Sequence, residues 1–497
     1  MRRNRLGGLI LSLWVCTYTF MIAHAQNDPA SGGTAGAPSA GDVFFPALGN
    51  GGYDVQHYDL TLYVPLTENH IDGEARILAV AEQDLSAFNL DLIGLNVDAL
   101  RVDGAPAQFS RDGRELTITP AVPLAAGASF VVEIGYSGTP FTLITPEIGW
   151  ENGWNFRDGR VIVASEPGGS ATWYPVNDHP LDKATYNFMI TVPVPYTAVA
   201  NGDLISTEQI AGTLTYHWRM DRPMASYLTS MQIDLLVLQT DESAEPTIRN
   251  FFPPYLLEEG AERFSAQREM MAYFEQVFGE YPFGSYGAVV VGESLRFALE
   301  TQTISLFGLN FIEDADSNRR QMTIAHELAH QWFGNSVSLS QWSDIWLNEA
   351  FATYASWLWL EQTDGTAVLN DIVRDTYQDM SGNTILAQGG TLESAQRYAS
   401  QFDPPGAPLR DDLFNAGVYY RGALLLHALR IEIGNPAFFA AIQAYLEEFQ
   451  YGNATTEDAI SAFETASGRD LDAFFRAWLY DSVMPDIPAL GLENRVS

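Results

Sequence analysis

The chain has 497 residues, of which 46% are hydrophobic, 12% aromatic and 18% charged. This is the composition of a globular protein of two or three domains, and it excludes a disordered chain, a collagen and a multi-span membrane protein. The 62 acidic and 26 basic residues give a net charge of −36. Such a surface repels phosphate backbones, so nucleic acid is not an expected partner. Lys183 is the only lysine among the 26 basic residues.

The first 25 residues have the pattern of a secretory signal peptide. Arg2, Arg3 and Arg5 precede an apolar stretch, which ends in an Ala-x-Ala cleavage sequence. We therefore expect an exported protein, in the periplasm, outside the cell or on its surface, without stable membrane association once the signal is cleaved. The alternative is an uncleaved signal that anchors the chain. The only cysteine, Cys16, lies within this segment, so the mature chain has no disulfide.

The rest of the chain divides by its apolar periodicity. Residues 26–44 are rich in Gly, Ala, Ser and Pro and predict a flexible leader. Over 45–245 apolar and polar residues alternate between Asn-Gly and Asp-Gly turns, which predicts an antiparallel β domain. Over 246–485 the period becomes helical, and 486–497 form a short tail. The expected fold class is α+β, multidomain, with a β domain followed by a mainly helical domain.

Within the second domain, apolar periodicity and capping residues predict several helices and one strand. One helix should end before Tyr281-Pro282, and a short strand should follow at 288–291. Further helices are expected at about 317–334, 343–365, 415–434, 437–450 and 456–480. We find no internal repeat.

The helix expected at 317–334 contains the sequence His-Glu-Leu-Ala-His. His326 and His330 are spaced i, i+4, which places both imidazoles on one helix face, as two ligands of one Zn²⁺ require. Glu327 can act as general base on a water at the metal. A catalytic zinc needs a third protein ligand, and Glu349, early in the next expected helix, is the natural candidate.

These motifs resemble those of the aminopeptidase N family. The resemblance lies in the sequences HELAHQWFGNSV and WLNEAFATY and in the spacing of eighteen residues between His330 and Glu349. Segments 166–184, 281–305 and 419–426 extend the resemblance over about 45 to 485. Members of this family are gluzincins, and the resemblance implies that 246–485 is a thermolysin-like catalytic domain. Most relatives continue into a C-terminal helical domain, so the resemblance is to a short form with an open cleft.

The resemblance also implies roles for residues outside the zinc motif. Glu300 matches the glutamate of the family's exopeptidase motif GxMEN, although Phe297 and Thr301 replace its glycine and asparagine. Glu166 matches a second group that binds the substrate amine. Tyr419 matches the tyrosine that stabilises the tetrahedral intermediate, and we expect its neighbour Tyr420 to be a packing residue.

Together these features predict a zinc-dependent aminopeptidase with one Zn²⁺ per chain and peptides as substrates. Two alternatives stay open. The altered exopeptidase motif permits a zinc endopeptidase, if it no longer binds the substrate amine. A non-catalytic, zinc-stabilised binding protein is the remote alternative, against which the presence of both Glu327 and Tyr419 argues. The sequence does not indicate the oligomeric state or the preferred N-terminal residue.

Overall fold

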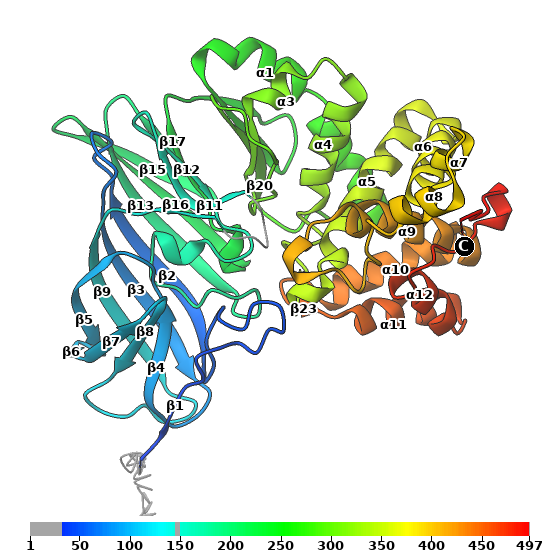
Figure 1. Ribbon diagram of the computed structural model, residues 1–497. Helices are drawn as coiled ribbons and strands as arrows, with labels where there is room; N and C mark the ends of the chain where they lie inside the picture. Colours follow the sequence, from blue (N-terminus) through cyan, green and yellow to red (C-terminus); the bar gives the residue numbers. More distant parts are fainter. Residues whose placement is uncertain (1–31, 145–149, 497) are drawn as a thin grey trace, which may run out of the picture.

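The computed structural model describes residues 32–144 and 150–496, so the predicted signal segment lies outside it. The β-rich and helical halves stand side by side in Figure 1, and the α+β prediction is confirmed. None of the helices in the described ranges is both long and apolar enough to cross a membrane.

The N-terminal half is built from three sheets. The largest has the order β15-β16-β13-β2-β3-β9-β5-β6 and the others have the orders β1-β4-β8-β7 and β10-β11-β12-β17-β14. Alternate residues of the long strands are buried, as the apolar alternation predicts. The strands are β1 (Thr34–Ala35), β2 (Tyr53–Tyr63), β3 (Ile71–Ala81), β4 (Leu85–Asp91), β5 (Asn96–Val102), β6 (Ala105–Pro106), β7 (Gln108–Asp112), β8 (Glu115–Thr119), β9 (Ser129–Gly138), β10 (Thr142–Ile144), β11 (Glu151–Arg157), β12 (Arg160–Ala164), β13 (Ala184–Pro193), β14 (Thr197–Ala200), β15 (Asp203–Ile210), β16 (Thr213–Met224) and β17 (Met231–Asp234).

The second half begins with a four-stranded sheet, ordered β18-β19-β20-β21. Its strands are β18 (Val237–Asp241), β19 (Thr247–Phe252), β20 (Ser285–Val291) and β21 (Ser305–Gly308). The predicted boundary at 245/246 falls between β18 and β19, which are hydrogen-bonded to each other. Sheet pairing therefore places the boundary before β18, because alternation along the chain does not reveal which sheet a strand joins.

Helices form the rest of this half. They are α1 (Leu257–Arg263), α2 (Gln267–Phe278), α3 (Leu309–Glu313), α4 (Ser317–Ala329), α5 (Trp346–Asp364), α6 (Thr366–Met380), α7 (Asn383–Ala387), α8 (Leu392–Ala399), α9 (Gly422–Ile433), α10 (Asn435–Glu448), α11 (Thr456–Ser467) and α12 (Asp472–Leu479). The helix expected at 456–480 is two helices, because Gly468 adopts φ 65° and ends α11. Two short strands, β22 (Ser338–Leu339) and β23 (Asn453–Ala454), pair in parallel.

Both ends of the described chain are packed. Strand β1 pairs with β4, and Asp42 is 3% exposed. Its carboxylate accepts hydrogen bonds from the backbone N–H groups of Phe44, Phe45 and Trp342, each at 2.8 Å. The flexible-leader prediction is therefore wrong for 32–44, since a buried side chain ties this segment to the helical half.

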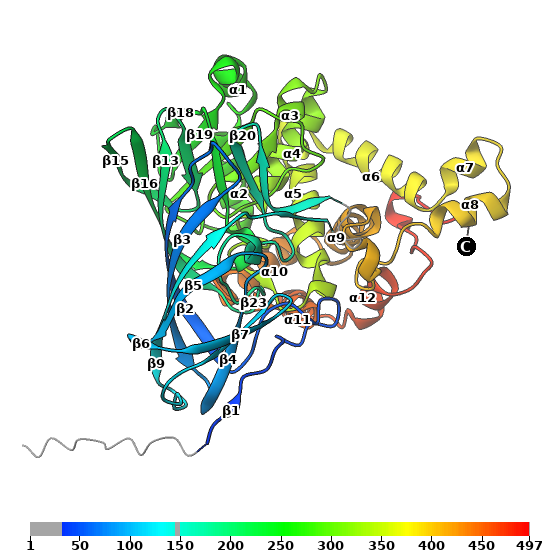
Figure 2. The ribbon, with the colours of Figure 1, turned by 60° about the vertical axis from the view of Figure 1, so that its left-hand side comes forward.

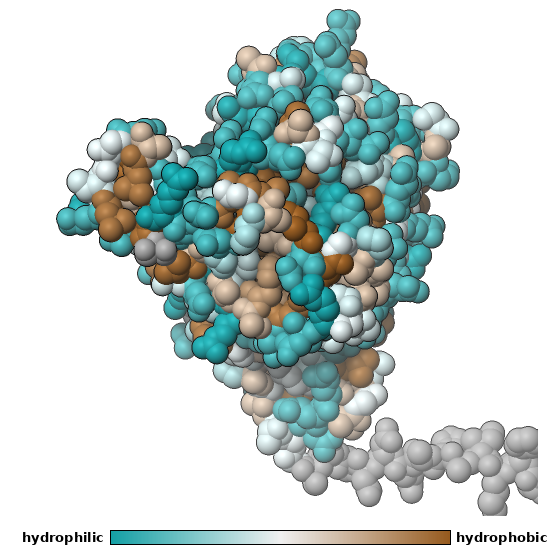
Figure 3. All heavy atoms as spheres, turned by 90° about the vertical axis from the view of Figure 1, so that its right-hand side faces the viewer, coloured by the Kyte–Doolittle hydropathy of each residue, from teal (hydrophilic) through white to brown (hydrophobic). Residues whose placement is uncertain are grey.

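The sequence did not predict helices α6 to α8, which form an arm that projects from the helical half (Figure 2) and appears as a lobe at the left in Figure 3. The predicted tail packs against this arm. Asn383 donates to the carbonyl of Glu493 at 2.8 Å, and Gln396 donates to that of Val496 at 3.1 Å.

Candidate active site

Three predicted metal ligands meet where α4 and α5 cross. Asp316 caps α4 by accepting from the backbone N–H groups of the first turn. His326 lies in the last turn of α4, His330 is its C-cap residue, and Glu349 lies in the first turn of α5. Nε2 of His326 lies 2.9 Å from Nε2 of His330 and 3.2 Å from Oε2 of Glu349. The third edge, from His330 Nε2 to Glu349 Oε2, is 3.4 Å.

This triangle fits a zinc ion. Tetrahedral zinc with bonds of about 2.0–2.2 Å separates its ligand atoms by about 3.3–3.6 Å. The two edges to Glu349, 3.2 and 3.4 Å, are close to this range, and the edge of 2.9 Å between the two histidines is shorter. Nδ1 of His330 donates to the carbonyl of Phe333 at 3.0 Å, which leaves Nε2 as the atom of this ring that can bind a metal. Burial opposes protonation of His330, but Glu300 and Glu349 raise its pKa to about 10. The site thus has a strongly negative potential that favours a cation.

Glu327 is buried beside this triangle. Its carboxylate, that of Glu300 and a nitrogen of His330 have atoms within 4.8 Å of one another. Burial raises the pKa of Glu327 well above its ordinary range, and the charges of Glu300 and Glu349 add to the rise, although His330 opposes it. A carboxylate in such surroundings accepts a proton readily, as a general base requires.

Glu166 and Glu300 also lie beside the metal-binding triangle. They are 5% and 3% exposed, and Oε1 of each is a buried atom without a hydrogen-bond partner in the described structure. The carboxylates of Glu166, Glu300 and Glu349 have atoms within 4.8 Å of one another. Burial raises the pKa of both Glu166 and Glu300, and mutual repulsion adds to the rise for Glu166. Among the described residues, Nδ1 of His330, 4.0 Å from Oε1 of Glu300, is the one positive group within ion-pair distance of the pair, so a cation bound between the two buried carboxylates would stabilise both.

The backbone of Glu300 is fixed by residues that follow the zinc motif. Its carbonyl accepts from Gln331 Nε2 at 3.1 Å and from Asn335 Nδ2 at 2.7 Å. The carbonyl of Glu166 accepts from Asn152 Nδ2 at 2.5 Å. Sequence reasoning did not find these three amides, because their partners are distant in the sequence.

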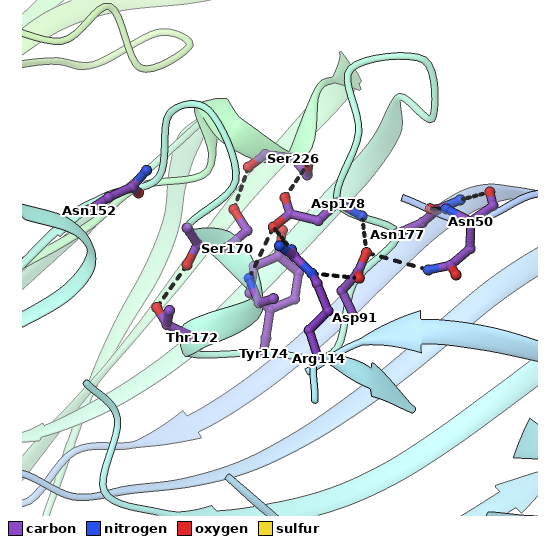
Figure 4. Close-up of polar contacts among 12 residues, drawn as sticks. Asn50, Asp91, Arg114, Asn152, Ser170, Thr172, Tyr174, Asn177, Asp178 and Ser226 are labelled. Atoms are coloured by element: carbon purple, nitrogen blue, oxygen red, sulfur yellow. Dashed lines mark hydrogen bonds and ion pairs between the residues drawn. The ribbon is translucent and has the colours of Figure 1, made fainter. Parts of the chain in front are cut away.

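A polar network supports the segment that follows Glu166 (Figure 4). Arg114 pairs with Asp91 at 2.9 Å and with Asp178 at 3.1 Å. Asp178 in turn accepts from Ser226 Oγ at 2.9 Å, and Ser170 Oγ donates to the carbonyl of Ser226 at 2.7 Å. The network therefore connects the β sheets to the loop that carries the second amine-binding candidate.

Tyr419 lies on a π-helical turn, Gly417–Arg421, directly before α9. Its ring is nearly parallel to that of His326, with the centroids 6.0 Å apart. Such turns often occur at functional sites, since they redirect one side chain. Tyr420 is 45% exposed and lines one cavity together with Tyr419 and the three metal ligands, so the prediction that it is a packing residue is wrong.

The site lies in a cavity of about 420 Å³, and all seven predicted site residues line it. Three aromatic side chains also line it: the ring of Trp150 lies 5.8 Å from that of Phe297 and 5.0 Å from that of Phe414. Sequence analysis missed Trp150 and Phe414. No local pattern marks them, because the three rings come from separate segments.

Comparison with known proteins agrees with this architecture. The model of the peptidase M1 N-terminal domain matches residues 54–228, and that of the peptidase family M1 domain matches 263–478. Aminopeptidase 2 of Saccharomyces cerevisiae is 24% identical over 85% of this chain and 45% of its own length. Leucyl aminopeptidase of Saccharolobus solfataricus is 25% identical, over 89% and 55% respectively. The chain thus spans about half the length of these curated relatives.

Solved structures match over nearly their whole length. The M1 zinc metallopeptidase of Deinococcus radiodurans, solved as a variant bound to a Tyr-Ser-Ala substrate, is 29% identical with a TM-score of 0.77. A two-domain M1 zinc metallopeptidase variant bound to L-arginine is 30% identical with a TM-score of 0.76. Each match covers 90% of this chain and 99% of the other. Both domain models match the chain, and a two-domain M1 structure is 30% identical to it over 90% of its length. The chain therefore belongs to peptidase family M1.

Proposed function

We propose that the protein is a zinc-dependent aminopeptidase, which removes N-terminal residues from peptides. The observation that carries this proposal is that Glu166 and Glu300, beside the metal-binding triangle, each have a buried carboxylate oxygen without a hydrogen-bond partner in the described structure. A peptide α-amine has a pKa of about 8, so it is mostly a cation near neutrality. Binding it between two carboxylates stabilises all three charges and places the first peptide bond towards the metal.

The metal would be one Zn²⁺ per chain, held by His326, His330 and Glu349. When bound, zinc polarises the scissile carbonyl and lowers the pKa of water. The aminopeptidases among the relatives and the zinc metallopeptidases among the solved structures support this assignment.

The protein side chains would move the protons. Glu327 takes a proton from the attacking water and delivers it to the leaving amine. The Tyr419 hydroxyl donates to the substrate oxygen on which negative charge develops. Burial, with Glu349 and other acids nearby, raises the pKa of Tyr419 well above its ordinary value, so this hydroxyl keeps its proton over the working range of pH.

Export is a separate proposal, which rests on the pattern of residues 1–25. Expression of the full chain in a bacterial host, followed by N-terminal sequencing of the exported protein, tests it. A mature N-terminus at Gln26 would support cleavage. An intact N-terminus in the membrane fraction would support the anchored alternative, and an intact N-terminus in the cytoplasm would contradict export.

The test of the activity is hydrolysis of one peptide in two forms, with a free N-terminus and N-acetylated, each with and without a chelator. We expect cleavage of the free form only, abolished by the chelator and restored by zinc. Equal cleavage of both forms would show an endopeptidase. Zinc binding without cleavage of either form would show a non-catalytic protein.

A further inference from the structure

Lys183, the only lysine in the chain, lies between the two domains just before β13. Its ammonium nitrogen is 3.1 Å from the carbonyl oxygen of Asn335, 3.0 Å from that of Ser336 and 2.8 Å from that of Gly452. These three acceptors use all three N–H bonds of an ammonium group.

The three-carbonyl arrangement distinguishes lysine from arginine. Each terminal nitrogen of a guanidinium has two N–H bonds, both in the plane of the group. No single nitrogen of an arginine can therefore serve three carbonyls that converge on one point. The other 25 basic residues are arginines, so the one lysine stands where three carbonyls converge on a single nitrogen.

The carbonyls belong to segments that frame the zinc motif. Residues 335 and 336 lie in the turn between α4 and β22, and residue 452 precedes β23, the partner strand of β22. Lys183 thus holds both segments to the β domain. Within the described residues, all of its hydrogen bonds go to backbone carbonyls and it forms no ion pair. Hydrogen bonds depend on direction, so Lys183 fixes the orientation of these backbone segments as well as their distance from the β domain.

Asn335 connects this contact to the substrate. Its backbone carbonyl accepts from Lys183, while its side chain donates to the carbonyl of Glu300 at 2.7 Å. A shift of Asn335 would therefore move Glu300, the acid to which the proposed function assigns the substrate α-amine. Its backbone N–H also donates to the carbonyl of His330 at 3.0 Å, which ties the same residue to the end of α4.

We propose that Lys183 is a positioning residue for amine recognition: by fixing the backbone of Asn335, it sets the position of Glu300. This inference rests on the proposed function, because it assumes that the site binds an α-amine. It does not require that Lys183 touch the substrate.

The test compares two probes bound to the zinc-loaded protein: leucine hydroxamate, which has an α-amine, and its desamino analogue, which lacks one. The ratio of their dissociation constants measures amine recognition without any turnover. We expect Lys183→Met and Lys183→Arg to reduce this ratio by about tenfold, since small misplacement of a binding group has effects of this order or larger. The zinc content and the affinity for the desamino probe should stay the same.

Arg268→Met is the matched control. Arg268 donates to the backbone carbonyls of Pro246 at 2.7 Å and Asp241 at 3.0 Å, at the turn between β18 and β19 and outside the site cavity. It should lower the melting temperature but leave the ratio unchanged. If Lys183→Met does not fold, Asn335→Ser removes the next link and should reduce the ratio in the same way.

A double substitution tests the route through Glu300. If Lys183 acts on Glu300, adding Lys183→Arg to Glu300→Gln should change the ratio less than it does in the native protein. Full additivity would overturn the proposal, and so would an unchanged ratio in the single Lys183 variants. A native protein that binds both probes equally would instead contradict the proposed amine recognition itself, so the two failures are distinguishable.

Discussion

The two sides of the site are built differently. On the metal side, His326, His330 and Glu349 come from two consecutive helices that pack against each other. On the amine side, Glu166 and Glu300 come from loops on either side of the domain boundary, held by Asn152, Gln331 and Asn335. The metal ligands are brought together by the residue spacing within one helix and by the packing of that helix against the next. The amine-binding pair forms only when the two domains are correctly joined.

This difference predicts two kinds of failure. Substitutions on the metal side should abolish activity outright and leave the domain contacts intact. Substitutions on the amine side should give graded losses, which appear mainly as weaker substrate binding. The predictions below test this contrast, from the largest expected effect to the smallest.

Removal of a metal ligand should have the largest effect. We expect His326→Ala or Glu349→Ala to lose bound zinc and all measurable hydrolysis, because two protein ligands do not hold a catalytic zinc. Metal analysis of the purified variants, together with an aminoacyl-p-nitroanilide assay, checks both. Asp470→Asn is the control and should keep its zinc, because Asp470 is an exposed acid in a separate cluster with Glu464 and Asp472. Full activity in metal-free protein would contradict the mechanism.

Loss of the general base should be nearly as severe but leave the metal in place. Glu327→Gln keeps the size of the side chain and removes its ability to accept a proton. We expect kcat to fall by about 10²–10⁴-fold or more, with normal zinc content. Pre-steady-state and steady-state kinetics on the same preparation provide the measurement. A variant that lost both zinc and activity would instead identify Glu327 as a ligand.

Substitution of Tyr419 by Phe tests a group that the metal helices do not supply. Its hydrogen bond to the substrate oxygen forms mainly in the transition state, so kcat should fall by about 10²–10³-fold with little change in KM. Tyr420→Phe removes the same hydroxyl from the adjacent position, and we expect a much smaller effect. If KM alone changed in Tyr419→Phe, the tyrosine would be a substrate-binding residue.

Substitution of Glu300 separates the two sides most directly. Charged hydrogen bonds contribute about 1.5–3 kcal/mol, so Glu300→Ala should lower kcat/KM by about ten- to a hundredfold, chiefly through KM. Zinc content should not change. Glu313→Ala, an exposed acid on α3, is the matched control. Equal KM values for native protein and Glu300→Ala would show that the amine is bound elsewhere.

The same contrast explains what could be predicted from the sequence. Spacing i, i+4 on one helix predicts that His326 and His330 lie together, and a short connection brings Glu349 to them. Glu166 and Glu300 followed only from family resemblance, since no local rule joins two loops. No pattern in the sequence indicated that Trp150 and Phe414 line the site. The leader was misjudged because its Gly and Ala content says nothing about Asp42, whose buried carboxylate binds the backbone of the helical half.

The smallest predicted effect concerns the network behind the amine side. Glu115 adjoins Arg114, and its Oε2 is buried without a hydrogen-bond partner in the described structure. Burial, followed by the charge of Asp91, raises the pKa of Glu115 from 4.5 to about 7. Between these two values folding takes up a proton, so the contribution of this group to the free energy of unfolding falls as the pH rises from about 4.5 to about 7.

Glu115→Gln should abolish this fall in the free energy of unfolding, because a neutral amide does not titrate. We expect the variant to melt a few degrees above the native protein at pH 8, as about 1 kcal/mol shifts the melting temperature by about 2–4 °C in a domain of this size. At pH 4 the two proteins should melt alike. Calorimetry from pH 4 to 8 measures both, with Glu133→Gln, an exposed acid on β9, as the control. A difference that stayed constant with pH would show that packing, not ionisation, is responsible. Unchanged KM values in Glu115→Gln would show that the network affects the stability of the protein but not the position of the amine-binding carboxylates.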